Sequence, residues 1–239
     1  MASMTEECVP LRALTFAEFK KGFAYDEEQL YSLLFKRNQE LIGIRREKFA
    51  VRNLKKIFRA TFKLVPKIGF QAMSLRDLLA ETGLSMGGVY LTITNKDNIA
   101  IIVKDAVTLV CEDIVETAKA EPDPTLALER LIKGYLYSSL LLQPWFYFLY
   151  AETRSLPLEH QNDSKNLERS QVSEIKGLIA ELQEKPQQGY PAEFIATMAL
   201  TMIQERYLKP WKYKQPAASI DEYAENCLRL IHHSVCHYW

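Results

Sequence analysis

The sequence predicts an all-α fold, and three observations support that expectation. Apolar side chains recur at intervals of three and four residues along most of the 239-residue chain. No stretch alternates between apolar and polar residues for long enough to indicate a strand. Breaks rich in proline, glycine and polar residues separate the helical stretches, most clearly at 121–124, 185–189 and 209–216.

The first helices are delimited by caps and helix breakers. Residues 1–25 fit no clear pattern, and a capped amphipathic helix is expected over residues 26–40. A longer helix with a regular apolar stripe is expected over residues 46–68. Proline lacks the backbone N–H and clashes with the preceding turn, so we expect Pro66 to end or distort this helix and Gly69 to close it.

The stretch from Ser74 to Tyr90 predicts two short helices joined by a tight turn. Ser74 is a good N-cap for the first helix, and Gly83 supplies the left-handed residue that stops it. Ser85 caps the second helix, whose exposed side begins with two glycines. A short helix with a slim leading edge can enter a DNA major groove, as in a helix-turn-helix. The stretch therefore indicates a DNA-binding protein.

The second half of the chain continues as helices. Asn95 is the expected N-cap of a long apolar helix that runs to about Ala118. A further helix begins at Thr125. The later ones are expected over residues 144–156, 158–184, 191–208 and 220–237.

Composition favours a soluble, cytoplasmic protein without a metal site. Hydrophobic residues make up 48% of the chain and charged ones 25%, which is typical of globular proteins. No apolar run approaches the roughly 20 residues that a membrane span needs, and the first residues lack the basic region of a signal peptide. The cysteines lack disulfide-framework or metal-site spacing. They are Cys8, Cys111, Cys227 and Cys236.

A net charge of zero conceals a basic block from Lys36 to Lys67, which holds eleven lysines and arginines against Glu40 and Glu47. Such a block alone is most simply a solvated helix face. Beside a helix-turn-helix it favours phosphate contacts. The basic residues are Lys36, Arg37, Arg45, Arg46, Lys48, Arg52, Lys55, Lys56, Arg59, Lys63 and Lys67.

Residues 57–99 resemble the DNA-binding domain of the TetR family of bacterial transcriptional regulators. The resemblance is specific because glycines, caps and an aromatic residue all fall in register. The matching residues are Ile57, Ala60, Phe62, Gly69, Phe70, Ser74, Leu75, Arg76, Asp77, Leu78, Gly83, Leu84, Ser85, Gly87, Tyr90, Asn95, Lys96 and Asp97. The resemblance implies an N-terminal three-helix domain with the helix-turn-helix, joined to a larger helical ligand-binding and dimerisation bundle. It divides the chain into a partly helical extension (1–45), the DNA-binding domain (46–106) and the effector-binding and dimerisation domain (107–239).

The resemblance also implies roles for individual residues. Ser74 and Arg76 would hold a phosphate at the start of the first short helix, and Lys96 would grip the DNA backbone. Tyr90 would reach a phosphate with its hydroxyl. The expected DNA-binding residues are Arg46, Lys48, Ser74, Arg76, Ser85, Met86, Gly87, Gly88, Tyr90, Leu91, Thr92, Thr94 and Lys96.

Two departures from the family pattern affect this expectation. Gly88 stands where the family often has a hydroxyl, and Leu91 and Thr92 stand where polar residues are common. The second helix therefore offers few base-edge donors, and readout would depend on the thymine methyl, on Thr92 and Thr94, and on DNA shape. The N-terminal extension leaves two alternatives open: it folds over the domain, or it places Arg45, Arg46 and Lys48 as an arm near the minor groove.

The segment 135–150 is rich in aromatic residues, which suits either core packing or the wall of an apolar ligand cavity. The expected effector-binding residues are Tyr135, Phe146, Leu149, Tyr150, Arg154, Met198 and Met202. A looser resemblance, carried by residues 150–157, 207–211 and 220–224, is to TetR-type regulators that sense fatty-acyl or other acyl-CoA thioesters, and it implies that the effector is a long apolar acid or its thioester. The last two apolar helices are expected to form a four-helix dimer seam.

The sequence thus predicts a homodimeric, ligand-responsive regulator without a cofactor, a repressor released from its double-stranded DNA operator by a small apolar effector such as a fatty acid or acyl-CoA. The alternative is a helical ligand-binding or interaction protein with a decayed helix-turn-helix. An enzyme is disfavoured, because none of the four histidines has a nucleophile or carboxylate motif around it. A zinc site on the last helix is a weaker interpretation than solvated residues. Its candidate ligands are His232, His233, Cys236 and His237.

Overall fold

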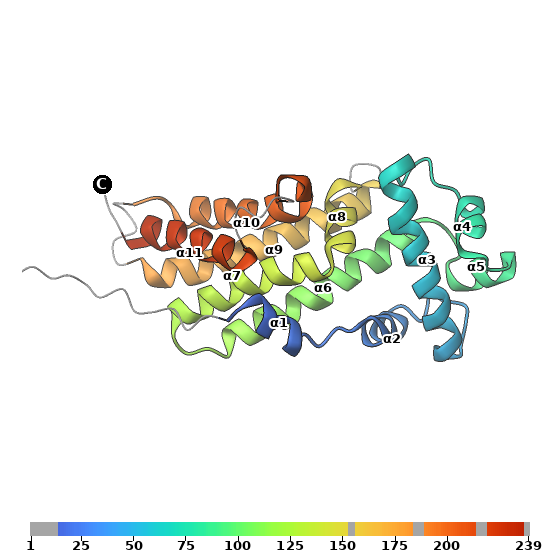
Figure 1. The fold of residues 1–239 in the computed structure, drawn as a ribbon, viewed down its shortest axis with the longest axis horizontal. Coiled ribbons are helices and arrows are strands. Elements are labelled where there is room, and N and C mark those ends of the chain that lie inside the picture. Colours follow the sequence, from blue (N-terminus) through green and yellow to red (C-terminus); the bar gives the residue numbers. More distant parts are fainter. Residues whose placement is uncertain (1–13, 153–155, 184–188, 214–218, 237–239) are drawn as a thin grey trace, which may run out of the picture.

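The computed structural model describes residues 14–152, 156–183, 189–213 and 219–236, and this part of the chain is helical without strands (Figure 1). The first helices are α1 (Phe16–Gly22), α2 (Glu27–Arg37), α3 (Glu47–Ile68), α4 (Leu75–Thr82), α5 (Met86–Thr92) and α6 (Asp97–Lys119). They are followed by α7 (Pro124–Leu141), α8 (Gln143–Ala151), α9 (Leu158–Leu182), α10 (Ala192–Leu208), the short 3₁₀ helix η2 (Pro210–Tyr213) and α11 (Ile220–Cys236). The all-α prediction is confirmed.

Helices α3, α4 and α5 form a compact group at one end of the molecule (Figure 1). Ser74 and Asp77 form a reciprocal capping box at the start of α4, and Gly83 ends that helix with a φ of 63°. Such positive φ angles are open mainly to glycine. The expected turn is therefore present. Gly69 closes α3 as predicted, with a φ of 77°, but Pro66 does not end it. Pro66 lacks a backbone N–H, but α3 ends two residues later, so the missing hydrogen bond affects only the last turn of the helix.

Helix α6 joins this end of the molecule to the larger bundle as one continuous helix (Figure 1). The side chain of Asn95 accepts a hydrogen bond from the backbone N–H of Asn98 at 3.1 Å, so the predicted capping residue lies two residues before the first residue of α6. Because α6 runs uninterrupted through residues 106 and 107, the division of the chain there remains a prediction.

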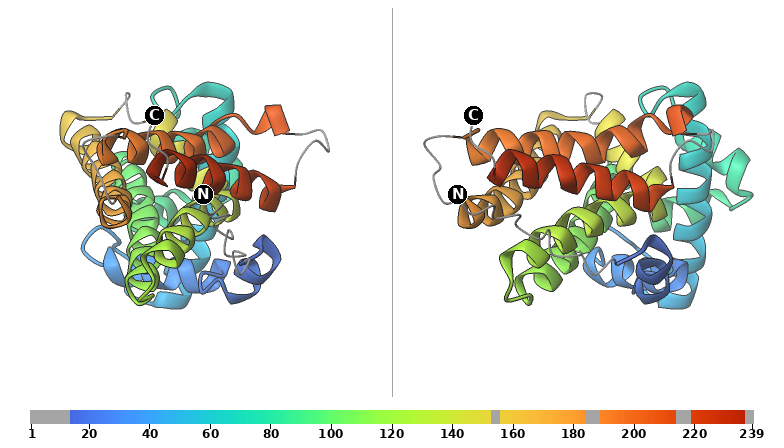
Figure 2. Two further views of the ribbon diagram at one scale, coloured as in Figure 1. Left: turned by 90° about the vertical axis from the view of Figure 1, so that its left-hand side faces the viewer. Right: turned by 60° about the vertical axis from the view of Figure 1, so that its left-hand side comes forward.

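The bundle is built around α7, which packs against α1, α6, α8, α9, α10 and α11. Its residues from Ala127 to Ser139 are buried with a single exception, Arg130. Burial all round the helix removes the one-sided pattern that a surface helix shows. Helices α10 and α11 lie side by side on one face of the bundle (Figure 2). Among the described residues, none of the helices combines the length and hydrophobicity that a membrane crossing requires.

The described part of the N-terminal extension, residues 14–45, packs on both parts of the protein. Helix α2 packs on α3 and α6, and the Tyr31 ring lies against the stacked rings of Phe58 and Trp145. Helix α1 packs on α7, and its first N–H group, that of Phe16, donates to Asp221 Oδ1 of α11 at 2.7 Å. The first of the two alternatives therefore describes the extension. The arm alternative is wrong for Arg45, Arg46 and Lys48, which lie in and just before the first turn of α3.

Candidate DNA-binding surface and effector cavity

Helix α5 presents an exposed apolar edge. Met86, Tyr90 and Leu91 are 62%, 45% and 56% exposed, whereas Val89 of the same helix is fully buried and fixes α5 to the domain. Positions four residues apart share a helix face, so Met86 and Tyr90 lie on one side. The Ser85 hydroxyl oxygen accepts from the Gly88 N–H at 3.1 Å and caps this edge. The outer edge of the predicted reading helix is therefore accessible from its first turn to its last.

Thr92 is the exception among the predicted DNA-binding residues of α5. Its side chain is fully buried, its hydroxyl donates to the Gly88 carbonyl at 2.6 Å, and it accepts from Asn53 Nδ2 of α3 at 3.2 Å. The prediction that Thr92 contacts DNA is wrong, because both the burial and the hydrogen bonds direct the side chain into the domain. At Gly88 an added Cβ would lie 3.3 Å from Ser85 Oγ.

Helix α3, which packs against α5, carries a row of exposed cations. Lys48, Arg52 and Lys56 follow one another at intervals of four residues, and among the described residues none of them forms an ion pair. The Arg52 guanidinium lies 5.2 Å from the centre of the Phe49 ring, which holds the side chain against the helix. Arg46, which precedes the helix, is also exposed and free of ion pairs in the described part. We call Arg46, Lys48, Arg52 and Lys56 the free basic row.

The rest of the basic block is largely neutralised, which the composition could not show. Arg59 makes two hydrogen bonds with Glu27, at 2.7 and 2.9 Å, and Lys63 pairs with Glu81 of α4. The phosphate contacts of the block stay a prediction, which the unpaired cations support best. The other paired members are Lys36 with Glu47, Arg37 with Glu112, and Lys55 with both Glu27 and Glu28.

Several residues predicted to bind phosphate already form hydrogen bonds within the protein. The Ser74 hydroxyl gives its proton to Asp77 Oδ2 at 2.6 Å, and these hydrogen bonds hold the pKa of Asp77 below its usual value. Lys96 Nζ donates to the carbonyls of Phe70 and Gln71 at 3.0 and 2.8 Å. Thr94 accepts from the Asn98 side chain at 2.8 Å. Arg76 is exposed, with no ion pair in the described part, and Gly87 faces open space.

Behind this domain, a cavity of about 240 Å³ opens between α6, α8, α9 and α10. Three of the predicted effector-binding residues, Phe146, Leu149 and Tyr150, line it together. The Tyr150 hydroxyl bonds to Glu168 and Gln204; burial and the Glu168 hydrogen bond raise its pKa far above the ordinary value. The other lining residues are Val107, Ser164, Lys165, Leu167, Glu168, Gln171 and Tyr207.

The other predicted effector-binding residues lie elsewhere. Tyr135 is buried in the core and is absent from this cavity wall, and Met202 is half-buried outside it. Met198 is 41% exposed on the outer side of α10, so the prediction that it lines the cavity is wrong. Arg154 lies outside the described residues. The aromatic segment predicted a cavity wall, but spacing cannot tell which side of a fully buried helix meets a void.

Four exposed apolar residues lie on or beside α10 and α11, and we call them the apolar patch: Tyr190 precedes α10, Phe194 and Met198 lie on α10, and Leu230 lies on α11. The rings of Tyr190 and Phe194 are stacked with their centres 5.7 Å apart. Three residues of the helices predicted to form the seam, Tyr207, Cys227 and Ile231, are instead buried within the chain. Large exposed apolar patches mark interaction surfaces.

No metal-binding group of three or more His, Cys, Asp or Glu occurs among the described residues. Of the zinc candidates, His232 is half-buried and His233 is exposed. His237 and the Cys236 side chain lie outside the described part. Burial lowers the pKa of His232 below its ordinary value, which favours the neutral ring. Cys111 and Cys227 are free and buried thiols.

The sequence matches no protein-family model and no curated protein, but its fold matches solved structures. PfmR, a TetR family regulator from Thermus thermophilus, has a TM-score of 0.61 at 17% identity, covering 75% of this chain and 96% of PfmR. The regulator FadR from Bacillus subtilis, solved with stearoyl-CoA, has a TM-score of 0.58 at 16% identity, covering 74% and 97%. The regulator AibR, solved with isovaleryl coenzyme A and operator DNA, has a TM-score of 0.59 at 15% identity, covering 74% and 97%.

Proposed function

We propose that this chain, which has the fold of TetR-family regulators, is a ligand-responsive transcriptional regulator that binds double-stranded DNA through α5. The observation that carries the proposal is the exposed edge of α5 beside the free basic row. From Thr82 to Lys96 the sequence contains no carboxylate, so nothing on α5 or its flanks repels phosphate. A solvated surface helix without a nucleic-acid partner would not need this combination of exposed apolar residues and unpaired cations.

In the proposed complex, α5 contacts the bases and the cations contact the phosphates. Met86 and Leu91 offer apolar contacts, which suit the thymine methyl group in the major groove. The exposed Tyr90 hydroxyl and Arg76 reach phosphates on either side. Because α5 holds few base-edge donors, phosphate contacts of the free basic row supply much of the affinity. Binding should therefore depend steeply on salt.

An electrophoretic mobility shift with the DNA that flanks the protein's own gene tests this proposal. Arg52→Gln and Lys56→Gln should each weaken binding and lower the salt slope by about one. Arg59→Gln is the matched control, since it lies on the same helix but its charge is already paired with Glu27. Absent or salt-insensitive binding would instead support the alternative of a decayed helix-turn-helix. An equal effect of all three variants would refute the role of the free basic row.

For the effector we propose a short apolar acyl group carried on an anionic molecule. FadR and AibR were solved with acyl-CoA thioesters. The cavity here is about 240 Å³, below the roughly 300–1,000 Å³ of drug-sized sites, which favours a short chain over a long one. The exposed Lys165 on its rim suits a phosphate or carboxylate. Release of DNA would follow because Val107 of α6 forms part of the wall, so an occupied cavity displaces α6.

Thermal shift with a series of acyl-CoAs tests the effector proposal. Short acyl thioesters should raise the unfolding temperature, and Leu149→Trp, which fills the cavity, should remove that shift. No shift with any acyl-CoA or fatty acid would reject this class of effector.

A homodimer joined through the apolar patch of α10 and α11 would place two copies of α5 on DNA. Light scattering should then show a dimer for the wild type and a weakened one for Phe194→Lys.

A further inference from the structure

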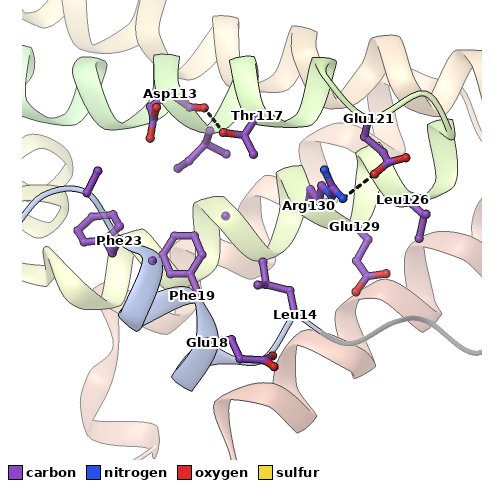
Figure 3. A pocket seen from close by; sticks show the side chains of 14 residues that line it. Leu14, Glu18, Phe19, Phe23, Asp113, Thr117, Glu121, Leu126, Glu129 and Arg130 are labelled. Atoms are coloured by element: carbon purple, nitrogen blue, oxygen red, sulfur yellow. Dashed lines mark hydrogen bonds and ion pairs between the residues drawn. The ribbon is translucent and has the colours of Figure 1, made fainter.

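A second and larger cavity lies under the N-terminal extension. Its volume is about 680 Å³, within the range of small-molecule sites. It is enclosed by α1 and the residues on either side of it, by the second half of α6 and by α7 (Figure 3). It shares no lining residue with the 240 Å³ cavity. Nothing in the proposed function accounts for it.

Carboxylates dominate the polar lining of this cavity. Arg130 is the one cation in the lining described. Figure 3 shows its guanidinium turned to Glu121, and the two form an ion pair at 2.6 Å. The cation is therefore already neutralised, and the remaining carboxylates leave the lining negative. The four acidic residues are Glu18 of α1, Asp113 of α6, Glu121 from the turn before α7, and Glu129 of α7.

Glu129 gives the cavity an incomplete polar site. Its residue is only 3% exposed, and its Oε1 accepts from Lys133 Nζ at 2.6 Å. Lys133 is shared with Glu225 of α11 at 2.7 Å, so two carboxylates divide one ammonium. The other oxygen of the buried carboxylate, Oε2, has no hydrogen-bond donor among the described residues. A buried carboxylate oxygen without a donor is unfavourable, and a donor brought by a ligand would relieve that cost.

The apolar part of the lining suits the body of such a ligand. The rings of Phe19 and Phe23 are half-buried with their centres 5.5 Å apart, and Leu14, Ile114 and Leu126 complete the apolar surface. Aromatic faces attract organic cations as well as apolar groups.

We propose that this cavity is a separate binding site for an organic cation, a protonated amine on an aromatic or aliphatic body. Its ammonium pairs with the Glu129 carboxylate, whose buried Oε2 turns toward the cavity to accept the hydrogen bond, and its body lies against Phe19 and Phe23. An anionic acyl thioester is excluded from this cavity by the same carboxylates. The two cavities therefore take ligands of opposite charge, and α6 forms a wall of both.

The probe for this proposal is 2-phenylethylammonium, compared with 2-phenylethanol and 3-phenylpropionate, which keep the aromatic body and change the charge. Saturation-transfer NMR on the full chain, without DNA or acyl-CoA, should detect binding of the ammonium only. Glu129→Gln should raise its Kd at least about tenfold, because a charge-assisted hydrogen bond is lost. The unfolding temperature shows whether that variant is folded.

Gly22→Trp provides a second variant that leaves every carboxylate in place. Gly22 lines the cavity, and a Cβ there meets no atom within 4 Å, so the indole can fill the space without disturbing the fold. It should abolish ammonium binding. Gly177→Trp on α9 is the matched control, since that glycine is equally open and remote from the cavity; it should leave binding unchanged. Equal binding of the three probes, no binding of the ammonium, or binding that survives Gly22→Trp would overturn the proposal. Acyl-CoA and DNA binding are measured separately, so these outcomes leave the proposed function untouched.

Discussion

Gly134→Ala should destabilise the protein, because α6 and α7 cross closely at this residue. An added Cβ would lie 2.6 Å from Ile114 Cγ2, whereas carbon atoms in contact prefer about 3.5–4.0 Å. Ile114 is β-branched and buried, so its methyl group cannot turn aside easily. Forcing a methyl group into a packed core costs about 1–3 kcal/mol.

The matched control for this variant is Gly177→Ala on α9, where the added Cβ meets no atom within 4 Å. Both substitutions gain about 0.5–1 kcal/mol of helix propensity, so this gain cancels when the two are compared. The remaining difference of about 1–3 kcal/mol corresponds to an unfolding temperature about 2–12 °C lower for Gly134→Ala than for Gly177→Ala.

Thermal unfolding followed by circular dichroism measures this difference. Adding Ile114→Ala should remove it, because the clashing methyl group is then gone, and a double-mutant cycle would show that coupling. Equal unfolding temperatures for Gly134→Ala and Gly177→Ala would refute the close crossing of α6 and α7.

Three further measurements test the buried polar groups. Thr92→Val should lower the free energy of unfolding by about 1–3 kcal/mol through its lost hydrogen bond to Asn53, with no change in the DNA affinity of the folded protein. Burial raises the pKa of Cys111 to about 12, so iodoacetamide at pH 8 should modify it only after unfolding, as mass spectrometry can show. Burial lowers the pKa of His232, so the unfolded chain takes up its proton more readily, and stability should fall as pH drops below about 6.5. His232→Gln should reduce that loss in thermal unfolding at about pH 7.5 and 5.5, whereas a variant of the exposed His233 should not.

The helix-turn-helix could be predicted because its signals are local. Ser74, Gly83 and Ser85 act on backbone groups within three or four residues, so their roles are written in the sequence around them. The burial of Thr92 depends on Asn53, which lies 39 residues away, and no local pattern reports that contact. A threonine near the end of a short helix therefore looked available to DNA when it was not.

The basic block and the cavities show a similar limit. Composition counts charges but does not show which of them are paired, and Arg59 is neutralised by Glu27, which precedes it by 32 residues and lies on another helix. The 680 Å³ cavity joins Phe19 to Gly134, far apart in the chain, and the N-terminal residues that enclose it fit no sequence pattern. Sequence patterns predicted the helices, but which residues face solvent or a cavity depends on how those helices pack against one another.

The hydrogen bond from the Phe16 N–H group to Asp221 can form only late in the synthesis of the chain. The two residues are 205 positions apart, so at about 5–20 residues per second α1 leaves the ribosome roughly 10–40 s before its partner exists. Throughout that interval the Phe16 N–H group lacks this acceptor, although the rings of Phe16 and Phe19 can pack on Tyr137 as soon as α7 has been made. The backbone at the start of α1 therefore gains its last hydrogen bond only when α11 is complete.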